Sequence, residues 1–269
     1  MAGTAKPLLT VASESQIERW DELVQALPST GGHFLQSRSF AEFKAQQGWQ
    51  PLYLVAELGG RHLPVLVLVR SVGIAGTLWY CPKGPAVDSV QLCVALVKAL
   101  RDFALRARPR PIAIRFEPLL ADGERTRRRL RGIGLRKVPN VQADASTIEI
   151  PLAQDEAQQF AALGRRARRY IRRGERDGVT VEQSGHRPAV ARDLYALMKT
   201  ANQGAGVPGL RSFSYHDGFW RSFCESGQGS FFIAYEEGRP VAGLFLVTYG
   251  RTASYKDGGS ATESSAGTA

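Results

Sequence analysis

Apolar side chains recur along this chain with two different spacings, which distinguish predicted helices from predicted strands. Spacings of three and four residues, typical of one helix face, occur in 13–27, 37–48, 89–107, 124–132, 155–176, 188–201 and 215–225. Continuous or alternating apolar runs, typical of strands, occur in 49–57, 62–71, 78–81, 111–117, 146–150, 179–182, 230–236, 241–249 and 252–255. Helices and strands that alternate in this way predict an α/β protein with mixed sheets.

These elements form two groups along the sequence, so we expect two domains, residues 1–150 and 151–269. The second group ends on strongly apolar strands, which are followed by a small and polar tail from Gly258 to Ala269. That tail offers no side chain that could contribute to a core. We therefore expect the second domain to be incomplete at its C-terminal end.

The charge of the chain narrows the class of its partners. Of 269 residues, 35 are Lys or Arg and 25 are Asp or Glu, which gives a net charge of +10 at neutral pH. Such an excess favours an anionic partner, namely nucleic acid, a nucleotide-linked substrate or a membrane surface. Hydrophobic residues make up 43% of the chain, a share that is typical of globular proteins and not of disordered ones.

The densest positive charge lies between Arg165 and Arg176, where arginines follow one another over about three helical turns. Arg166 and Tyr170 are four residues apart and therefore share one helix face. Arginine binds phosphate through paired hydrogen bonds, and a phenol adds a directed donor. A phosphorylated ligand or a polyanion would explain a helix whose arginines repel one another, and the alternative is a solvent-exposed basic face without a ligand. The second arginine-rich segment, 124–132, is expected to be a solvent-exposed basic helix, with contact to RNA phosphates as the alternative.

The sequence predicts no metal, no cofactor and no catalytic side chain. Its cysteines and histidines are scattered, without the paired spacing of zinc sites or disulfide frameworks; they are Cys81, Cys93, Cys224, His33, His62, His186 and His216. No nucleophile stands in an arrangement with a base. Residues 1–16 lack the apolar region of a signal peptide, and no apolar run is long enough to span a bilayer. We therefore expect a soluble, cytoplasmic, monomeric protein.

Four short motifs follow one another along the chain. They are Phe34-Leu35-Gln36-Ser37 with Phe40, Phe43-Lys44 and Gly48-Trp49; Tyr80-Cys81-Pro82-Lys83-Gly84-Pro85 with Asp88; Arg166 through Ile171-Arg172 to Gly178-Val179; and Glu237-Gly238 to Ala242-Gly243 with Tyr255 to Ser260. In this order they resemble the FemABX family of peptidoglycan-bridge aminoacyltransferases. The similarity spans about residues 30 to 260, and the short connection from 201 to 215 resembles the FemX-like members, which lack a helical arm.

The resemblance implies tandem domains of the Gcn5-related N-acetyltransferase (GNAT) fold. It also implies an enzyme of peptidoglycan biosynthesis that transfers an amino acid from aminoacyl-tRNA to the stem-peptide amine of a precursor. The implied partners are aminoacyl-tRNA and either UDP-MurNAc-pentapeptide or a lipid-linked precursor, which would bring the protein to the inner membrane surface. The family continues beyond the last residues of this chain. We therefore expect the acceptor half of the site here without the donor half, and an inactive fragment.

Residues of the precursor site are carried over from the same resemblance. Lys44 falls where the family has a helix-borne lysine that contacts the precursor, and the Arg166–Tyr170 pair resembles the family's pair for the diphosphate and sugar. The remaining candidates are Arg168 and Arg172 on the same helix, and Tyr255, which resembles a tyrosine beside the acceptor peptide. This chain departs from the family's pattern at Tyr170, where many members have asparagine, and at Asp257, which replaces a tyrosine.

Two other interpretations stay open. An acyl-CoA-dependent GNAT N-acyltransferase would share the fold, but it needs a glycine-rich phosphate loop after a strand. The stretch Gln203-Gly204-Ala205-Gly206 is a poor match, since Pro208 stands at a position that needs a small residue. A non-catalytic basic nucleic-acid-binding protein would expose aromatic side chains among its arginines, and here only Tyr170 does so.

Overall fold

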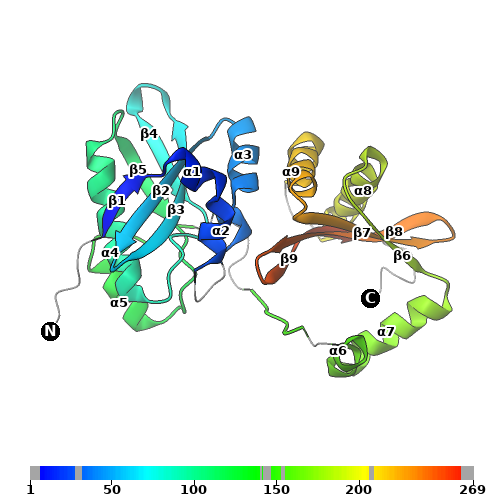
Figure 1. Cartoon of the computed structure of the whole chain (residues 1–269). Helices are drawn as coiled ribbons and strands as arrows, with labels where there is room; N and C mark the ends of the chain where they lie inside the picture. Colours follow the sequence, from blue (N-terminus) through cyan, green and yellow to red (C-terminus); the bar gives the residue numbers. More distant parts are fainter. Residues whose placement is uncertain are drawn as a thin grey trace. The chain divides into compact units, whose positions relative to one another are not determined.

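The structure, a computed structural model, describes residues 7–27, 32–139, 141, 147–152, 155–205 and 209–261 (Figure 1). The chain divides into two compact units. One comprises Met1–Val141 together with Tyr249–Thr252, and the other comprises Gln142–Thr248 together with Ala253–Ala269. Each unit has a sheet and a buried core of its own.

The first unit is built on a five-stranded sheet in the order β1-β2-β3-β4-β5. Its strands are β1 (Leu8–Val11), β2 (Gln50–Leu58), β3 (Arg61–Ser71), β4 (Thr77–Cys81) and β5 (Pro111–Phe116). Strands β1 to β4 pair antiparallel with their neighbours, whereas β4 pairs with β5 in parallel. Gly59 and Gly60 form the turn between β2 and β3, and both have a positive φ, which glycine adopts without strain.

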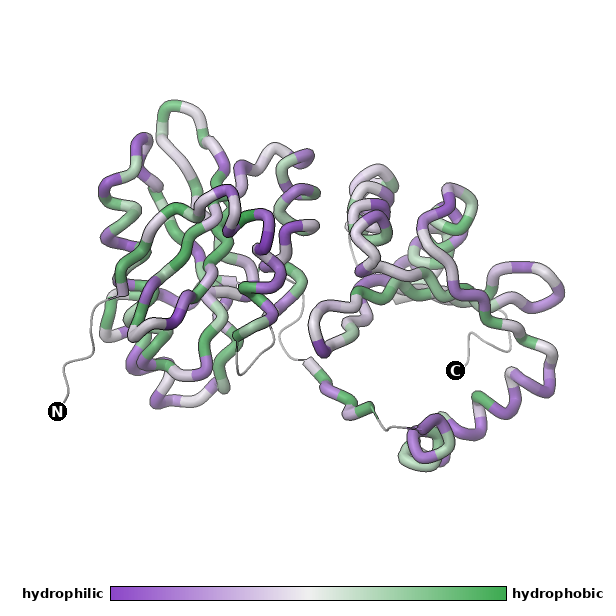
Figure 2. The backbone as a smooth tube through the Cα atoms, in the orientation of Figure 1, coloured by the Kyte–Doolittle hydropathy of each residue, from purple (hydrophilic) through white to green (hydrophobic). Residues whose placement is uncertain are grey.

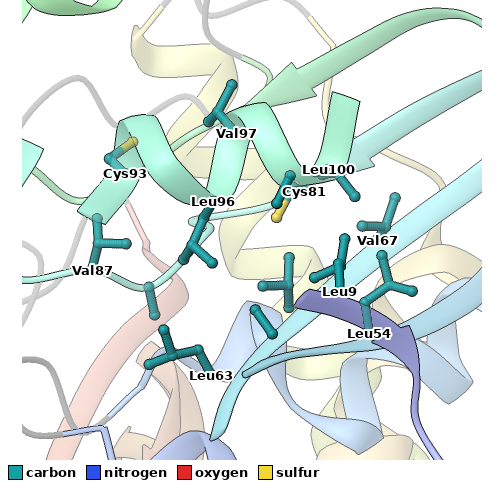
Figure 3. Close-up of a cluster of buried hydrophobic side chains, with 14 of the residues drawn as sticks. Leu9, Leu54, Leu63, Val67, Cys81, Val87, Cys93, Leu96, Val97 and Leu100 are labelled. Atoms are coloured by element: carbon teal, nitrogen blue, oxygen red, sulfur yellow. The ribbon is translucent and has the colours of Figure 1, made fainter. Parts of the chain in front are cut away.

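Helices cover this sheet and close its core. They are α1 (Glu14–Glu18), α2 (Trp20–Gln25), α3 (Arg38–Gln46), α4 (Val90–Arg106) and α5 (Glu124–Arg131), with the 3-10 turns η1 (Phe34–Gln36) and η2 (Gly73–Ala75). The longest of them, α4, begins where the Ser89 hydroxyl accepts a hydrogen bond from the Leu92 amide. One side of α4 then forms a buried cluster with Leu54 and Val67 of the sheet (Figure 3).

A buried glutamine fixes the start of α3 against the sheet. The Gln36 side chain is 1% exposed. Its Nε2 donates to the Pro82 carbonyl at 2.6 Å and to the Leu66 carbonyl at 3.3 Å, and its Oε1 accepts from the Leu66 amide at 2.9 Å. Trp20 Nε1 donates to the Gln36 carbonyl at 2.8 Å. These bonds satisfy the buried polar atoms of Gln36 and hold the chain just before α3 in one position.

The second unit contains a four-stranded sheet in the order β6-β7-β8-β9. Its elements are α6 (Glu156–Ala162), α7 (Arg165–Arg176), β6 (Thr180–Ser184), α8 (Pro188–Ala205), α9 (Phe213–Glu225), β7 (Gly229–Glu236), β8 (Arg239–Tyr249) and β9 (Thr252–Ser260). Helices α8 and α9 lie on one face of the sheet (Figure 1). The core between them is aromatic: Trp220 and Phe223 of α9 are buried, and the rings of Phe231 and Phe245 meet edge to face at 4.9 Å.

The mixed α/β architecture is confirmed, but some predicted elements are wrong. Residues 147–150 form no strand, and Ile148 and Ile150 are 89% and 65% exposed, because no strand of the described chain pairs with them. The predicted helix 155–176 is two helices, since the chain is extended at Leu163 and Gly164. The predicted helix 13–27 is likewise divided at Arg19.

Candidate functional site

Helix α7 has no buried residue and is the most hydrophilic helix of the second unit (Figure 2). It begins after Gly164, which provides no side-chain cap, and it ends at Asp177 before Gly178, whose φ is 77°. The Arg173 guanidinium pairs with Asp177 at 3.2 Å. Within the described residues, no carboxylate pairs with the other arginines of α7. Like charges on adjacent turns destabilise a helix by about 0.3 kcal/mol per pair, so an anionic ligand would relieve this repulsion.

Arg166 and Tyr170 are in direct contact on this helix. Arg166 Nε donates to the Tyr170 hydroxyl oxygen at 3.2 Å. The guanidinium groups of Arg166 and Arg169 lie 5.4 Å and 5.3 Å from the centre of the Tyr170 ring. Hydrogen bonding from Arg166 and then from Arg169 lowers the pKa of Tyr170. The phenol is thus an acceptor for arginine, and its own proton remains available for a ligand.

Arg168 and Arg172 connect α7 to the helix before it. Arg168 Nη1 donates to the Ala161 carbonyl at 3.2 Å, and the Arg172 guanidinium lies 5.3 Å from the centre of the Phe160 ring. Both side chains therefore hold the last turn of α6 against α7. Their contacts give them a structural role in addition to any role in ligand binding.

The arginines of α7 line an open groove of about 830 Å³. The residues that line it are Arg165, Arg166, Arg168, Arg169, Arg172 and Arg176. Ligand sites typically measure about 300 to 1,000 Å³, so the groove has room for a diphosphate and a sugar. Because the described residues that line it are all cationic, the groove favours negatively charged ligands.

A second group of cations lies in the first unit, around Trp49. Lys44 of α3 places its Nζ 5.5 Å from the centre of the Trp49 ring, and the guanidinium of Arg70 at the end of β3 lies 5.4 Å from the same centre. Lys44 is half-buried and also borders Phe40 and Phe43. In the described part of the chain, no carboxylate pairs with Arg70. Both cations therefore lie against the same indole ring.

Tyr80 and a rigid turn adjoin this cluster. The Tyr80 ring lies 6.2 Å from that of Trp49, and its hydroxyl donates to Glu117 at 2.6 Å. In the turn that follows, Lys83 has a φ of 47° and Gly84 leaves no space for a side chain, since a Cβ there would lie 2.7 Å from Cys81 Sγ. The positive φ of Lys83 is unusual for a residue other than glycine.

Tyr255 lies in β9 and is 65% exposed. Its hydroxyl occupies the space that a side chain at Gly258 would need, and a side chain at Gly259 would collide with the backbone of α8 at Leu197. These close approaches explain both glycines of the Tyr255 to Ser260 motif. Among the described residues, no hydrogen bond or ring contact joins Tyr255 to α7.

Asp257, where the chain departs from the FemABX pattern, is a buried anchor. It accepts hydrogen bonds from Trp220 Nε1 at 2.9 Å and from Lys256 at 3.0 Å, and His216 Nδ1 lies 3.6 Å away. Burial alone would raise the pKa of Asp257, but the neighbouring His216 and the charge of Lys256 hold it at about 2. The carboxylate therefore fastens β9 to α9.

The predicted site residues are thus divided between the units. Lys44 belongs to the first unit, whereas the other predicted residues, namely Arg166, Arg168, Tyr170, Arg172 and Tyr255, belong to the second. Arg166 and Tyr170 are in contact, as their spacing predicts. The described residues hold no group of three or more histidine, cysteine or acidic side chains placed to bind a metal ion.

Trp49 and Arg70 are cluster residues that the sequence reasoning missed, although a signal was present. The Gly59–Gly60 turn fixes the β2–β3 register, in which Gln50 faces Val69. One step further along the hairpin, Trp49 and Arg70 come together. His186, which its position beside Gly185 predicts to be inert, pairs with Asp217 at 2.8 Å and joins the start of α8 to α9, a contact between distant segments that no local pattern indicates.

Comparison with known proteins confirms the resemblance at the level of the fold. Residues 162–267 match the family described as the acetyltransferase (GNAT) domain. A crystal structure of FemX matches with a TM-score of 0.73 at 18% identity, over 95% of this chain and 81% of that one. The chain therefore has the FemX fold, and its residues 162–267 match a GNAT-type acetyltransferase domain.

Weaker structural matches are a tandem GNAT protein from the clavulanic acid biosynthesis pathway and the C-terminal domain named for a lysylphosphatidylglycerol synthetase from Agrobacterium fabrum. The first has a TM-score of 0.45 and 11% identity, and covers 96% of this chain and 79% of that one. The second has a TM-score of 0.43 and 12% identity, and covers 93% and 69%. No curated protein sequence matches this chain.

Proposed function

We propose that this chain is a FemX-like aminoacyltransferase that acts on a peptidoglycan precursor. The donor would be an aminoacyl-tRNA and the acceptor the stem-peptide amine of the precursor. The observation that carries the proposal is the Arg166–Tyr170 contact on an exposed arginine helix of a protein with the FemX fold. Such a pair offers a guanidinium fork and a phenolic donor to a phosphate group.

In the proposed reaction the acceptor amine attacks the ester carbon of the aminoacyl-tRNA. A C–N bond forms, the C–O bond to the terminal ribose breaks, and the proton lost by the amine balances the proton gained by the ribose hydroxyl. Aminolysis of an ester is favourable, so holding two substrates together can supply much of the acceleration. The residues of this chain are assigned to binding the acceptor, and none is assigned as the base.

Arg166 and Tyr170 would hold the diphosphate and sugar of the precursor. Arg169, whose guanidinium also lies against the Tyr170 ring, would add charge beside them. In the first unit, Lys44 of α3 and Arg70 of β3, which both lie at the Trp49 ring, would bind further anionic groups of the acceptor. Contact of the long polyanionic tRNA with this basic protein would weaken steeply with salt.

Calorimetric titration with UDP-MurNAc-pentapeptide tests the proposal. Arg166→Ala is compared with Arg173→Ala, which removes the same charge from the same helix but takes it from a guanidinium already paired with Asp177. We expect Arg166→Ala to weaken binding roughly thirtyfold, the loss of a charge-assisted hydrogen bond worth about 2 kcal/mol, and Arg173→Ala to weaken it less than threefold. Equal losses would show that charge alone matters, and absence of binding by the folded wild type would contradict the proposal.

A second candidate is an acyl-CoA-dependent N-acyltransferase, which the GNAT family match favours. The glycine-bearing stretch considered for a phosphate loop does not support it, since Gln203 to Ala205 belong to the end of α8. Titration with coenzyme A distinguishes the two functions. Saturable binding of coenzyme A without binding of the UDP-linked precursor would establish the acyl-CoA enzyme instead.

A further inference from the structure

A second concentration of positive charge, besides helix α7, lies in one segment of the first unit. Residues 98–137 contain thirteen Lys or Arg and four Asp or Glu, a net charge of +9, whereas the whole chain carries +10. The segment runs from the middle of α4 through β5 and α5. Helix α5 has no buried residue and carries five arginines, of which Arg127 pairs with Asp122 at 2.6 Å. The other arginines of α5 meet no carboxylate in the described chain.

An apolar groove lies within this basic segment. It has a volume of about 230 Å³ and is lined by Val97, Ile114, Phe116, Ile133 and Leu135, together with Gly134 and the exposed cations Lys98 and Arg101. Helices α4 and α5 pack against each other in the same region. The groove therefore combines an apolar floor with positive charge at its rim.

The exposed side of α4 extends this combination. Lys98, Arg101 and Leu105 are spaced by three and four residues and share one helix face. The apolar side chain of Leu105 is 53% exposed. Two cations and one leucine thus share an exposed stripe of α4.

We propose that this surface, formed by the exposed side of α4, the groove and the arginines of α5, binds the surface of an anionic phospholipid membrane. The arginines and Lys98 would lie against the headgroup phosphates, and Leu105 and the apolar groove would take up hydrocarbon at the interface. Surfaces that attach to membranes from one side combine these two features. In the described chain no helix is long and apolar enough to cross a bilayer.

Nucleic acid is a poorer match to the same surface. Duplex RNA would engage the arginines through its phosphates but would leave the apolar groove and Leu105 without a contact. Single-stranded RNA is held by stacking on aromatic side chains. The aromatic residues of this segment are Phe103 and Phe116, and both are partly buried against the core. An anionic amphiphile, in contrast, uses the charge and the apolar surface together.

Co-sedimentation of the full chain with lipid vesicles tests the proposal. We expect binding to vesicles that contain phosphatidylglycerol and none to vesicles of phosphatidylcholine alone. Each basic residue near an anionic membrane strengthens binding about fivefold, so Lys98→Gln with Arg101→Gln should weaken it about 25-fold. The matched control is Arg61→Gln with Arg251→Gln, which removes the same charge from two exposed arginines outside the surface and should weaken binding less than threefold.

Leu105→Gln separates apolar contact from charge. It leaves the net charge unchanged and should weaken vesicle binding roughly threefold, even at a salt concentration that screens the charges. A loss after the Lys98/Arg101 change no larger than the control's would overturn the proposal. So would an RNA hairpin that binds the wild type and loses its affinity in this variant while vesicle binding persists.

The inference stands apart from the proposed function. All variants should keep the wild-type affinity for soluble UDP-MurNAc-pentapeptide, which also verifies that they are folded. Vesicle binding without precursor binding would defeat the proposed function and leave the membrane surface in place. Precursor binding without vesicle binding would overturn the membrane surface and leave the proposed function in place.

Discussion

The two cation clusters of this protein, one around Trp49 and one along α7, are held in position by different means. Around Trp49, the lysine of α3 and Arg70 of β3 come from separate elements. Their positions depend on the sheet and on the buried bonds of Gln36. On α7, Arg166 is positioned by Tyr170 one turn away, and no residue of the helix is buried.

The difference separates ligand binding from stability. Substitutions on α7 remove exposed side chains, so they should change affinity while leaving the free energy of unfolding nearly unchanged. The cluster around Trp49 is supported by the buried core of the first unit, so substitutions in that support should lower the free energy of unfolding as well. The following predictions test this contrast, beginning with the largest effect.

Gln36→Leu should destabilise the first unit by about 3 kcal/mol. Leucine has a similar volume but leaves the Leu66 amide and the Pro82 carbonyl buried without their present partner. Urea unfolding followed by tryptophan fluorescence measures the loss. Arg165→Ala on α7 is the control, and it should change the free energy of unfolding by less than about 0.5 kcal/mol. Similar values for the two variants would remove the contrast between the clusters.

Acidification should weaken the first unit through His33, which precedes η1. Burial and the neighbouring Lys83 lower the pKa of His33 from 6.5 to about 4, so the folded state keeps this ring neutral. Above pH 6.5 the ring is neutral in both states and its contribution to stability is complete. As the pH falls from 6.5 to 4, the unfolded chain takes up a proton that the folded chain does not, and about 3 kcal/mol is lost.

Urea unfolding at a series of pH values checks this window, with His33→Asn as the matched variant. Asparagine can still accept the hydrogen bond that His33 Nδ1 receives from the Leu35 amide, but it does not titrate. Its stability should be flatter between pH 6.5 and 4 than that of the wild type. The same slope in both proteins would assign the acid sensitivity to another group.

The sequence predicts contacts between residues close along the chain well and contacts between distant segments poorly. Helix α7 and the Arg166–Tyr170 contact follow from helical spacing alone. The β2–β3 hairpin follows from Gly59 and Gly60, and its register brings Trp49 to Arg70. Each of these is decided within a few residues or by one tight turn.

Other features depend on partners far away in the sequence. Gln36 bonds to segments 30 and 46 residues further on, which no local pattern indicates. The alternation of Ile148 and Ile150 predicts a strand, yet hydrogen bonds to a second strand are needed to form one, and the described chain provides none. Asp257 breaks the family motif, and only the contacts with Trp220 and Lys256 show it to be a structural anchor.

Arg70→Ala should weaken binding of UDP-MurNAc-pentapeptide roughly tenfold, the loss of about 1.4 kcal/mol of charge-assisted interaction. Arg61→Ala is the matched control, since Arg61 is also exposed and stands at the opposite end of β3. The control should bind as the wild type does. If Arg70→Ala also binds normally, the cluster around Trp49 contributes through Lys44 alone, and the first unit holds one ligand cation and not two.

The smallest effect is expected from Tyr170→Phe, which keeps the ring and removes the hydroxyl. Arg166 would lose its hydrogen-bond acceptor but keep its position over the ring, where the guanidinium lies 5.4 Å from the centre. Affinity for the precursor should fall about threefold, as for a neutral hydrogen bond of about 0.7 kcal/mol, with no change in urea unfolding. A loss as large as that of Arg166→Ala would mean that the hydroxyl sets the direction of the guanidinium, so that α7 positions its ligands as strictly as the core positions those around Trp49.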